Sequence, residues 1–152
     1  MAMHFNALSL ARQLRYAAGG VLLALSAQAA CADVYVIMNA SNPVRSLSRQ
    51  EVSDLYLGRT RELPNGLAVT LFDQPNDQAA RAEFFQLLVN MPLPQVNAYW
   101  ARLSFTGRQT PPQTRADDAA VMAVISKSER AIGFVGTRPS DPSLRVVLHL
   151  KE

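Results

Sequence analysis

The apolar residues of the chain fall into short continuous runs and into positions spaced for helices. The continuous runs are rich in β-branched and aromatic residues and end at turn-forming residues, a pattern typical of buried strands. We expect strands at 33–39, 67–72, 131–135 and 144–150, the last at an edge of the sheet. Helical spacing of apolar residues predicts helices from Ser48 to Gly58 and over 77–89, 94–103 and the region around 121–125.

The first predicted helix has marked ends. Ser48 and Glu51 have the spacing of a capping box, in which each side chain binds the backbone N–H of the other residue. Gly58 stands where a C-terminal cap belongs. Strands that alternate with helices predict an α/β domain whose sheet is mostly parallel and flanked by helices. The aromatic residues that we expect to be buried against this sheet are Phe84, Phe85 and Trp100.

The N-terminal segment has the pattern of a secretory signal peptide. Two arginines and no acid precede an apolar run at 17–25, and two A-x-A cleavage sites end at Ala29 and Ala32. The apolar stretch is shorter than the roughly 20 residues that a membrane-spanning helix needs. We therefore expect a signal peptide at 1–32, cleaved after Ala32 or Ala29, and a periplasmic domain at 33–152 that does not span the membrane.

Cys31 leaves two alternatives open at this end of the chain. Acylation of this cysteine would make the protein a lipoprotein, although Gln28 occupies the position where bacterial lipoproteins usually carry leucine. An uncleaved membrane anchor is the other alternative. After cleavage at Ala32 the chain has no cysteine, which excludes disulfides, thiol nucleophiles and cysteine-based metal sites.

Charge and motif content narrow the function. Once Arg12 and Arg15 leave with the signal peptide, 13 of the 15 basic residues remain against 12 acidic ones, a net charge of +1. Nucleic-acid-binding proteins normally carry a concentrated basic face, so we expect no nucleic-acid partner.

His149 is the only histidine after the signal peptide, and no catalytic or metal-binding motif is present. Asp117 and Asp118 are adjacent, which suits a helix N-terminus better than an acid–base pair. We expect no enzyme activity, no metal and no cofactor.

Three loops are candidate parts of a ligand site. In an open α/β sheet, ligands bind at the carboxyl ends of the strands, where loops meet helix N-termini. A helix N-terminus offers free N–H groups to an anion, and an arginine adds a fixed positive charge. Ordinary turn and cap chemistry is the alternative for each loop. The residues that we expect to bind a ligand are Ser41 and Asn42 after the first strand, Asn76, Asp77, Gln78 and Ala79 after the second, and Arg108 after the 94–103 helix.

Three segments, in order along the chain, resemble the phosphate-binding protein of bacterial ABC transporters, a type 2 periplasmic binding protein. They are Leu47–Arg59, which ends in Tyr-Leu-Gly-Arg, Val69–Phe72 with the loop and helix that follow, and Arg130–Val135, which reads Arg-Ala-Ile-Gly-Phe-Val. The resemblance extends over roughly residues 34–135 and implies a single α/β lobe equivalent to half of a two-lobed binding protein. It also implies phosphate or another small anion as ligand, and a membrane transporter or sensor protein as partner.

The segment that binds phosphate in that family differs here. The family carries an Asp-Gly-Ser-Gly-Thr motif at a helix N-terminus, and the corresponding residues, aligned on Phe84, are Asn76–Ala80. The hydroxyl groups are absent, and the carboxylate of Asp77 repels an anion. Two functions therefore remain: a solute-binding module related to phosphate uptake or sensing, and a ligand-less accessory module that binds another protein of the cell envelope.

Overall fold

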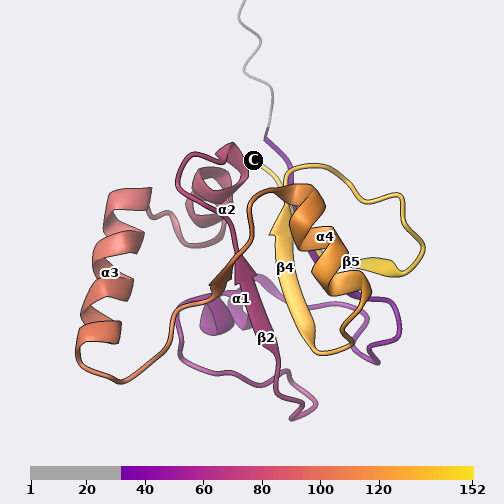
Figure 1. Cartoon of the computed structure of the whole chain (residues 1–152), viewed down its shortest axis with the longest axis horizontal. Helices are drawn as coiled ribbons and strands as arrows, with labels where there is room; N and C mark the ends of the chain where they lie inside the picture. The colour runs from indigo at the N-terminus through magenta and orange to yellow at the C-terminus, as the bar shows by residue number, and fades with distance from the viewer. Residues whose placement is uncertain (1–31) are drawn as a thin grey trace, which may run out of the picture. The chain divides into compact units, whose positions relative to one another are not determined.

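The computed structural model describes residues 32–152 (Figure 1). The expected signal peptide, apart from its last residue, lies outside the described residues, as does Cys31. The helices are α1 (Arg49–Tyr56), α2 (Ala79–Val89), α3 (Leu93–Phe105) and α4 (Asp118–Ser126). The strands are β1 (Val34–Asn39), β2 (Thr70–Asp73), β3 (Gln113–Thr114), β4 (Ala131–Val135) and β5 (Leu144–Leu150). Within residues 32–152, no helix has the length and apolar character needed to cross a bilayer.

The strands form one five-stranded sheet in the order β3-β2-β4-β1-β5. β2 runs parallel to both β3 and β4, whereas β1 is antiparallel to both β4 and β5. Four strands therefore share one direction, and β1 alone runs against them. The expected α/β fold with a mostly parallel sheet is confirmed, and β5 lies at an edge as predicted. The reversed direction of β1 was not predicted, and it decides which loops meet.

Helices cover both faces of the sheet. Every residue of β1 is buried, which confirms a strand covered on both sides. Its alternate residues serve two cores: Val36 and Met38 face α1, α2 and α3, whereas Tyr35 and Ile37 face α4. Because helices cover both faces of β1, its residues form an uninterrupted apolar run in the sequence.

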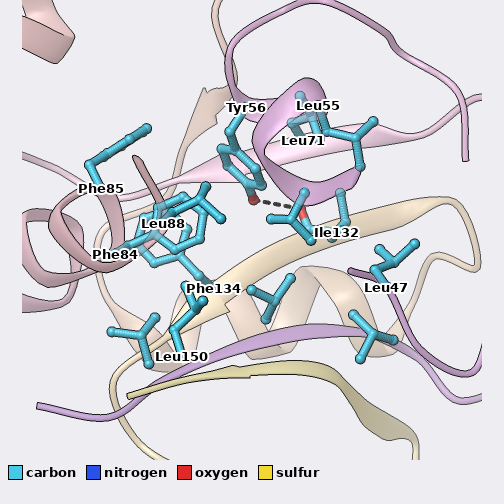
Figure 2. Packing of buried hydrophobic residues seen from close by; sticks show 14 of the residues in the cluster. Leu47, Leu55, Tyr56, Leu71, Phe84, Phe85, Leu88, Ile132, Phe134 and Leu150 are labelled. Atoms are coloured by element: carbon cyan, nitrogen blue, oxygen red, sulfur yellow. Dashed lines mark hydrogen bonds between the residues drawn. The ribbon is translucent and has the colours of Figure 1, made fainter. Parts of the chain in front are cut away.

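Aromatic rings fill the larger of the two cores (Figure 2). The ring of Phe84 lies parallel to that of Phe134, with centroids 4.0 Å apart, and Tyr56 meets Phe84 edge to face. The Tyr56 hydroxyl donates a hydrogen bond of 2.8 Å to the carbonyl of Phe72, so this buried polar group is satisfied. The expected burial of the three aromatic residues on the helices is confirmed for Phe84, Phe85 and Trp100.

The helix α4 approaches the sheet closely because β4 presents a glycine to it. A Cβ atom on Gly133 would lie 2.7 Å from Cγ1 of Val121 and 2.9 Å from Cδ1 of Ile125. Both distances are too short for packed carbon atoms, so any larger residue would displace α4. The glycine in the Ala-Ile-Gly-Phe-Val strand therefore sets the spacing between α4 and the sheet.

The ends of α1 are those that its sequence predicts. The Ser48 hydroxyl accepts a hydrogen bond of 3.1 Å from the backbone N–H of Glu51, and the Glu51 carboxylate accepts one of 2.7 Å from the N–H of Ser48. Gly58 has a φ of 70°, the left-handed conformation in which glycine ends a helix. The capping box and the terminal glycine are both confirmed.

The boundaries of the second strand differ from the prediction. The strand expected from Leu67 begins instead at Thr70. The residues before it form a hydrogen-bonded loop. The N–H of Leu63 donates to the carbonyl of Leu67, and the N–H of Val69 donates to the carbonyl of Arg61. The apolar residues 67–69 therefore pair within a local loop. The short β3 follows directly after two prolines, and the sequence analysis did not predict it.

Candidate functional site

The carboxyl ends of β2 and β4 meet the N-termini of α2 and α4, and a polar hollow of about 150 Å³ opens at this edge. Edges of this kind are where open α/β sheets place their ligands. The hollow is lined by Asp73, Gln74, Pro75, Asn76, Arg81, Asn97 and Thr114. The side chains around it hold one another through a network of hydrogen bonds.

A buried ion pair between Asp73 and Arg81 is the centre of this network. Nε of Arg81 lies 3.0 Å from one carboxylate oxygen of Asp73, and Nη2 lies 3.1 Å from the other. Nη1 donates to the amide oxygens of Asn76 at 2.7 Å and Asn97 at 3.0 Å. Burial raises the pKa of Asp73 above its ordinary value, and the hydrogen bonds and charge of Arg81 oppose that rise. Every nitrogen of the guanidinium therefore donates a hydrogen bond to a group of this chain.

A second carboxylate occupies the backbone donors at the end of β4. The carboxylate of Asp118 accepts hydrogen bonds from the N–H groups of Gly136, at 3.0 Å, and Thr137, at 2.9 Å. It also accepts one of 2.8 Å from the side-chain amide of Gln74. Converging N–H groups of this kind are what a protein uses to bind an anion. In this chain the carboxylate of Asp118 occupies the position where such an anion would bind.

Two further features describe the electrostatics of the edge. Gln74 is 1% exposed, and its side-chain oxygen has no hydrogen-bond donor within the described residues. Burial, followed by the charge of Asp118, raises the pKa of Glu83 on α2. The carboxylates of Glu83 and Asp118 are therefore close enough to interact, and their charges disfavour a ligand of high negative charge near them.

The first turn of α2 is the part of the edge best suited to an anion. Gln78 is the N-cap residue, and its side chain makes no capping hydrogen bond. The N–H of Arg81 donates to the carbonyl of Gln78 at 3.0 Å, so only the N–H groups before Arg81 are candidates for an anion. Asp77, immediately before them, is exposed and carries a charge of the wrong sign.

The structure brings together only part of the predicted ligand set. Asn76, Asp77, Gln78 and Ala79 lie at the start of α2, and Asn76 lines the hollow. Whether these residues bind a ligand stays a prediction. The expectation that all three loops converge at one edge of the sheet is wrong, since the other two lie elsewhere.

The loop after β1 lies at the opposite end of the strands, because β1 is antiparallel to β4. Asn42 is buried there, and its side chain donates to the carbonyl of Glu129 at 2.7 Å and accepts from the N–H of Val44 at 2.9 Å. These bonds are turn chemistry, the alternative considered for each loop. Ser41 is exposed at the same opposite end. Neither residue can share a ligand with Asn76.

Arg108 lies beyond the C-terminal end of α3, whereas Asn97, in the first half of that helix, lines the hollow. Since a helix rises 1.5 Å per residue, the end of α3 at Phe105 lies about 12 Å along the helix from Asn97. Arg108 therefore lies at the other end of α3 from the hollow, and whether it binds a ligand there stays a prediction.

Sequence analysis missed the residues that dominate the edge. Asp73 ends a buried strand, and Arg81 stands among apolar positions of a helix; each is a signal for a buried polar contact, but the pairing of the two is not visible in one sequence. Asp117 and Asp118 do begin a helix as predicted, with Asp117 capping the N–H of Ala120 at 2.9 Å. The contacts of Asp118 to the neighbouring strand were not foreseen.

Comparison with known proteins bears on the fold. No protein-family model and no curated protein matches the chain. Two similar solved structures are described as a putative phosphate ABC transporter substrate-binding protein and as an ABC-type phosphate transport receptor. The one from Clostridium perfringens, with bound phosphate, has 16% identity, a TM-score of 0.60 and coverage of 76% of this chain and 45% of that one. The one from Vibrio cholerae has 14% identity, a TM-score of 0.59 and coverage of 76% and 47%. The chain spans less than half the length of these structures and shares the fold of that part.

Proposed function

We propose that the chain is an exported accessory lobe with a solute-binding-protein fold that acts together with another envelope protein, a transporter or a sensor. In this proposal it is not an enzyme, and by itself it holds phosphate or another small anion only weakly. The proposal rests on one observation. Carboxylates of the chain itself accept the hydrogen bonds of those donors at this edge that are best suited to bind an anion. Asp73 holds Arg81, and Asp118 holds the backbone N–H groups of Gly136 and Thr137.

Direct capture of phosphate is the second candidate function. The uncapped first turn of α2 favours it, because these N–H groups face the same edge as the hollow. A single lobe leaves such an anion half in water, where charge-assisted hydrogen bonds are weakened. A second face, from another copy or from a partner protein, would exclude that water and add donors. We therefore place the solute site of the complete system, if phosphate is its solute, between this lobe and its partner.

Calorimetric titration of the monomeric protein with phosphate separates the two functions. We expect a dissociation constant no lower than about 0.1–1 mM, because only a few kcal/mol of binding free energy are available at a half-exposed site. Asp77→Asn should strengthen any binding at α2, since it removes the nearest repelling charge. Arg108→Ala is the matched control and should leave the titration unchanged. A submicromolar constant in a demonstrated monomer would contradict the proposal and favour direct capture.

The export part of the proposal has its own test. The charged, apolar and small-residue order of the N-terminal segment predicts cleavage after Ala32, or after Ala29. N-terminal sequencing of the protein from the periplasmic fraction should therefore begin at Asp33 or Ala30. A full-length chain retained in the membrane would contradict export with cleavage, and an acylated Cys31 would identify a lipoprotein.

A further inference from the structure

Phe105 is the one large hydrophobic side chain that is exposed among residues 32–152, with 95% of its surface accessible. It is the last residue of α3, the helix that lies on the outer side of the fold (Figure 1). Burial of such a ring against another apolar surface would be favourable, because it would remove apolar area from water.

The surrounding backbone holds Phe105 in this exposed position. The N–H of Gly107 donates to the carbonyl of Ser104 at 3.0 Å, and that of Arg108 donates to the carbonyl of Leu103 at 3.2 Å. Gly107 has a φ of 66°, which completes a tight helix-ending turn. The exposed ring is thus presented by a hydrogen-bonded turn and not by a frayed end.

Contacts further back fix α3 to the rest of the fold. Trp100 is 6% exposed, and the hydroxyl of Tyr99 donates to the carbonyl of Leu57 at 2.6 Å. The segment after the turn is held as well, because Arg61 donates to the carbonyl of Thr110 at 2.6 Å and to the side chain of Gln109 at 3.0 Å. The end of the helix is therefore a rigid projection.

Two arginines flank the projection in the sequence. Residues 84–116 contain no acidic residue and three arginines, although the whole of 33–152 is nearly neutral. Two of these arginines, Arg102 and Arg108, flank Phe105, and both are exposed. Neither forms an ion pair within the described part of the chain. We call Arg102, Phe105 and Arg108 the α3 tip.

We propose that the α3 tip docks on an anionic membrane surface, with Phe105 inserted at the headgroup boundary and the two arginines on lipid phosphates. Basic side chains are attracted to anionic lipids, and aromatic side chains favour the headgroup boundary. A protein interface normally buries a broad patch with several apolar side chains at its centre. Phe105 stands alone at a convex helix end, so the lipid surface fits the geometry better. This inference does not depend on the function proposed above.

Co-sedimentation of the purified protein with vesicles tests the tip. Vesicles of equal parts phosphatidylglycerol and phosphatidylcholine should bind the protein at low salt, and vesicles of phosphatidylcholine alone should bind it much less. Each basic group near an anionic surface changes partitioning about fivefold, so Arg102→Gln with Arg108→Gln should reduce binding at least tenfold, allowing for partial contact. Phe105→Ser should reduce binding by about five- to tenfold.

The matched control is Arg45→Gln with Arg130→Gln, which removes the same charge from two exposed arginines elsewhere and should leave vesicle binding near the wild-type value. Every variant carries the same N-terminal segment, so differences among them report on the tip. Equal loss in the control pair and the tip pair would reduce the effect to net charge and overturn the proposal. Unchanged binding of Phe105→Ser would also overturn it. If the wild type bound no vesicles but bound an acidic protein, and the tip variants lost that binding, the tip would be assigned to a protein partner instead.

Discussion

Phe84→Ala is expected to lower the free energy of unfolding by about 3–5 kcal/mol, the usual cost of truncating a fully buried phenylalanine. Its ring is 0% exposed and stacks on Phe134, while Tyr56 and Phe85 meet it edge to face. Removing the ring opens a cavity between α2 and the sheet and deprives three aromatic neighbours of a contact. For a domain of this size, the loss is a large fraction of the total stability.

Urea denaturation, followed by the fluorescence of the single tryptophan, Trp100, measures this effect. Phe105→Ala is the matched control, because it removes the same atoms from a fully exposed position and should change stability by no more than about 0.5 kcal/mol. Equal midpoints for the two variants would show that α2 does not pack on the sheet as described.

Arg81→Met is expected to cost about 3–5 kcal/mol near neutral pH, since it leaves the buried carboxylate of Asp73 without its partner. The methionine keeps an unbranched apolar side chain in place of the aliphatic part of the arginine, whereas the guanidinium that lies over the ring of Phe85 at 5.2 Å is lost. The measured loss therefore reports the unpaired charge more than the lost volume. Urea denaturation at neutral and mildly acidic pH gives both the size of the effect and its pH dependence.

The sign of that dependence follows from the pKa of Asp73. Burial raises it above its unfolded value, so the folded state binds this proton more tightly, and the contribution to stability falls as pH rises through the folded pKa. Without Arg81 the pKa rises further. The gap between Arg81→Met and wild type should therefore be widest near neutral pH and narrow towards acid.

A double variant provides the control for this pair. Asp73→Asn with Arg81→Met removes both charges and should recover part of the stability lost by Arg81→Met alone. A single variant as stable as wild type across this pH range would contradict the ion pair as described. So would a double variant that is less stable than Arg81→Met.

The fold was predictable where local rules decide the structure. β1 and β4 are covered on both faces and so appear as apolar runs, and the capping box of α1 lies within four residues. The direction of β1 was not predictable, because its pairing depends on strands at the other end of the chain. Ser41 and Asn42 were misplaced for this reason alone. The ion pair of Asp73 with Arg81 was missed because it depends on how α2 docks on β2, which no short pattern encodes.

The position of β1 in the sheet has a consequence for the order in which the chain can fold. β1 is the first strand to be synthesised, yet its two neighbours are β4 and β5, and Tyr35 pairs with Val135 and His149. Contacts between such distant residues make folding slow, since a long loop must close before they form. The sheet cannot be completed on the ribosome until the last strands have emerged. In a nascent chain, β1 therefore stays without its two partner strands until residues 131–150 have been made.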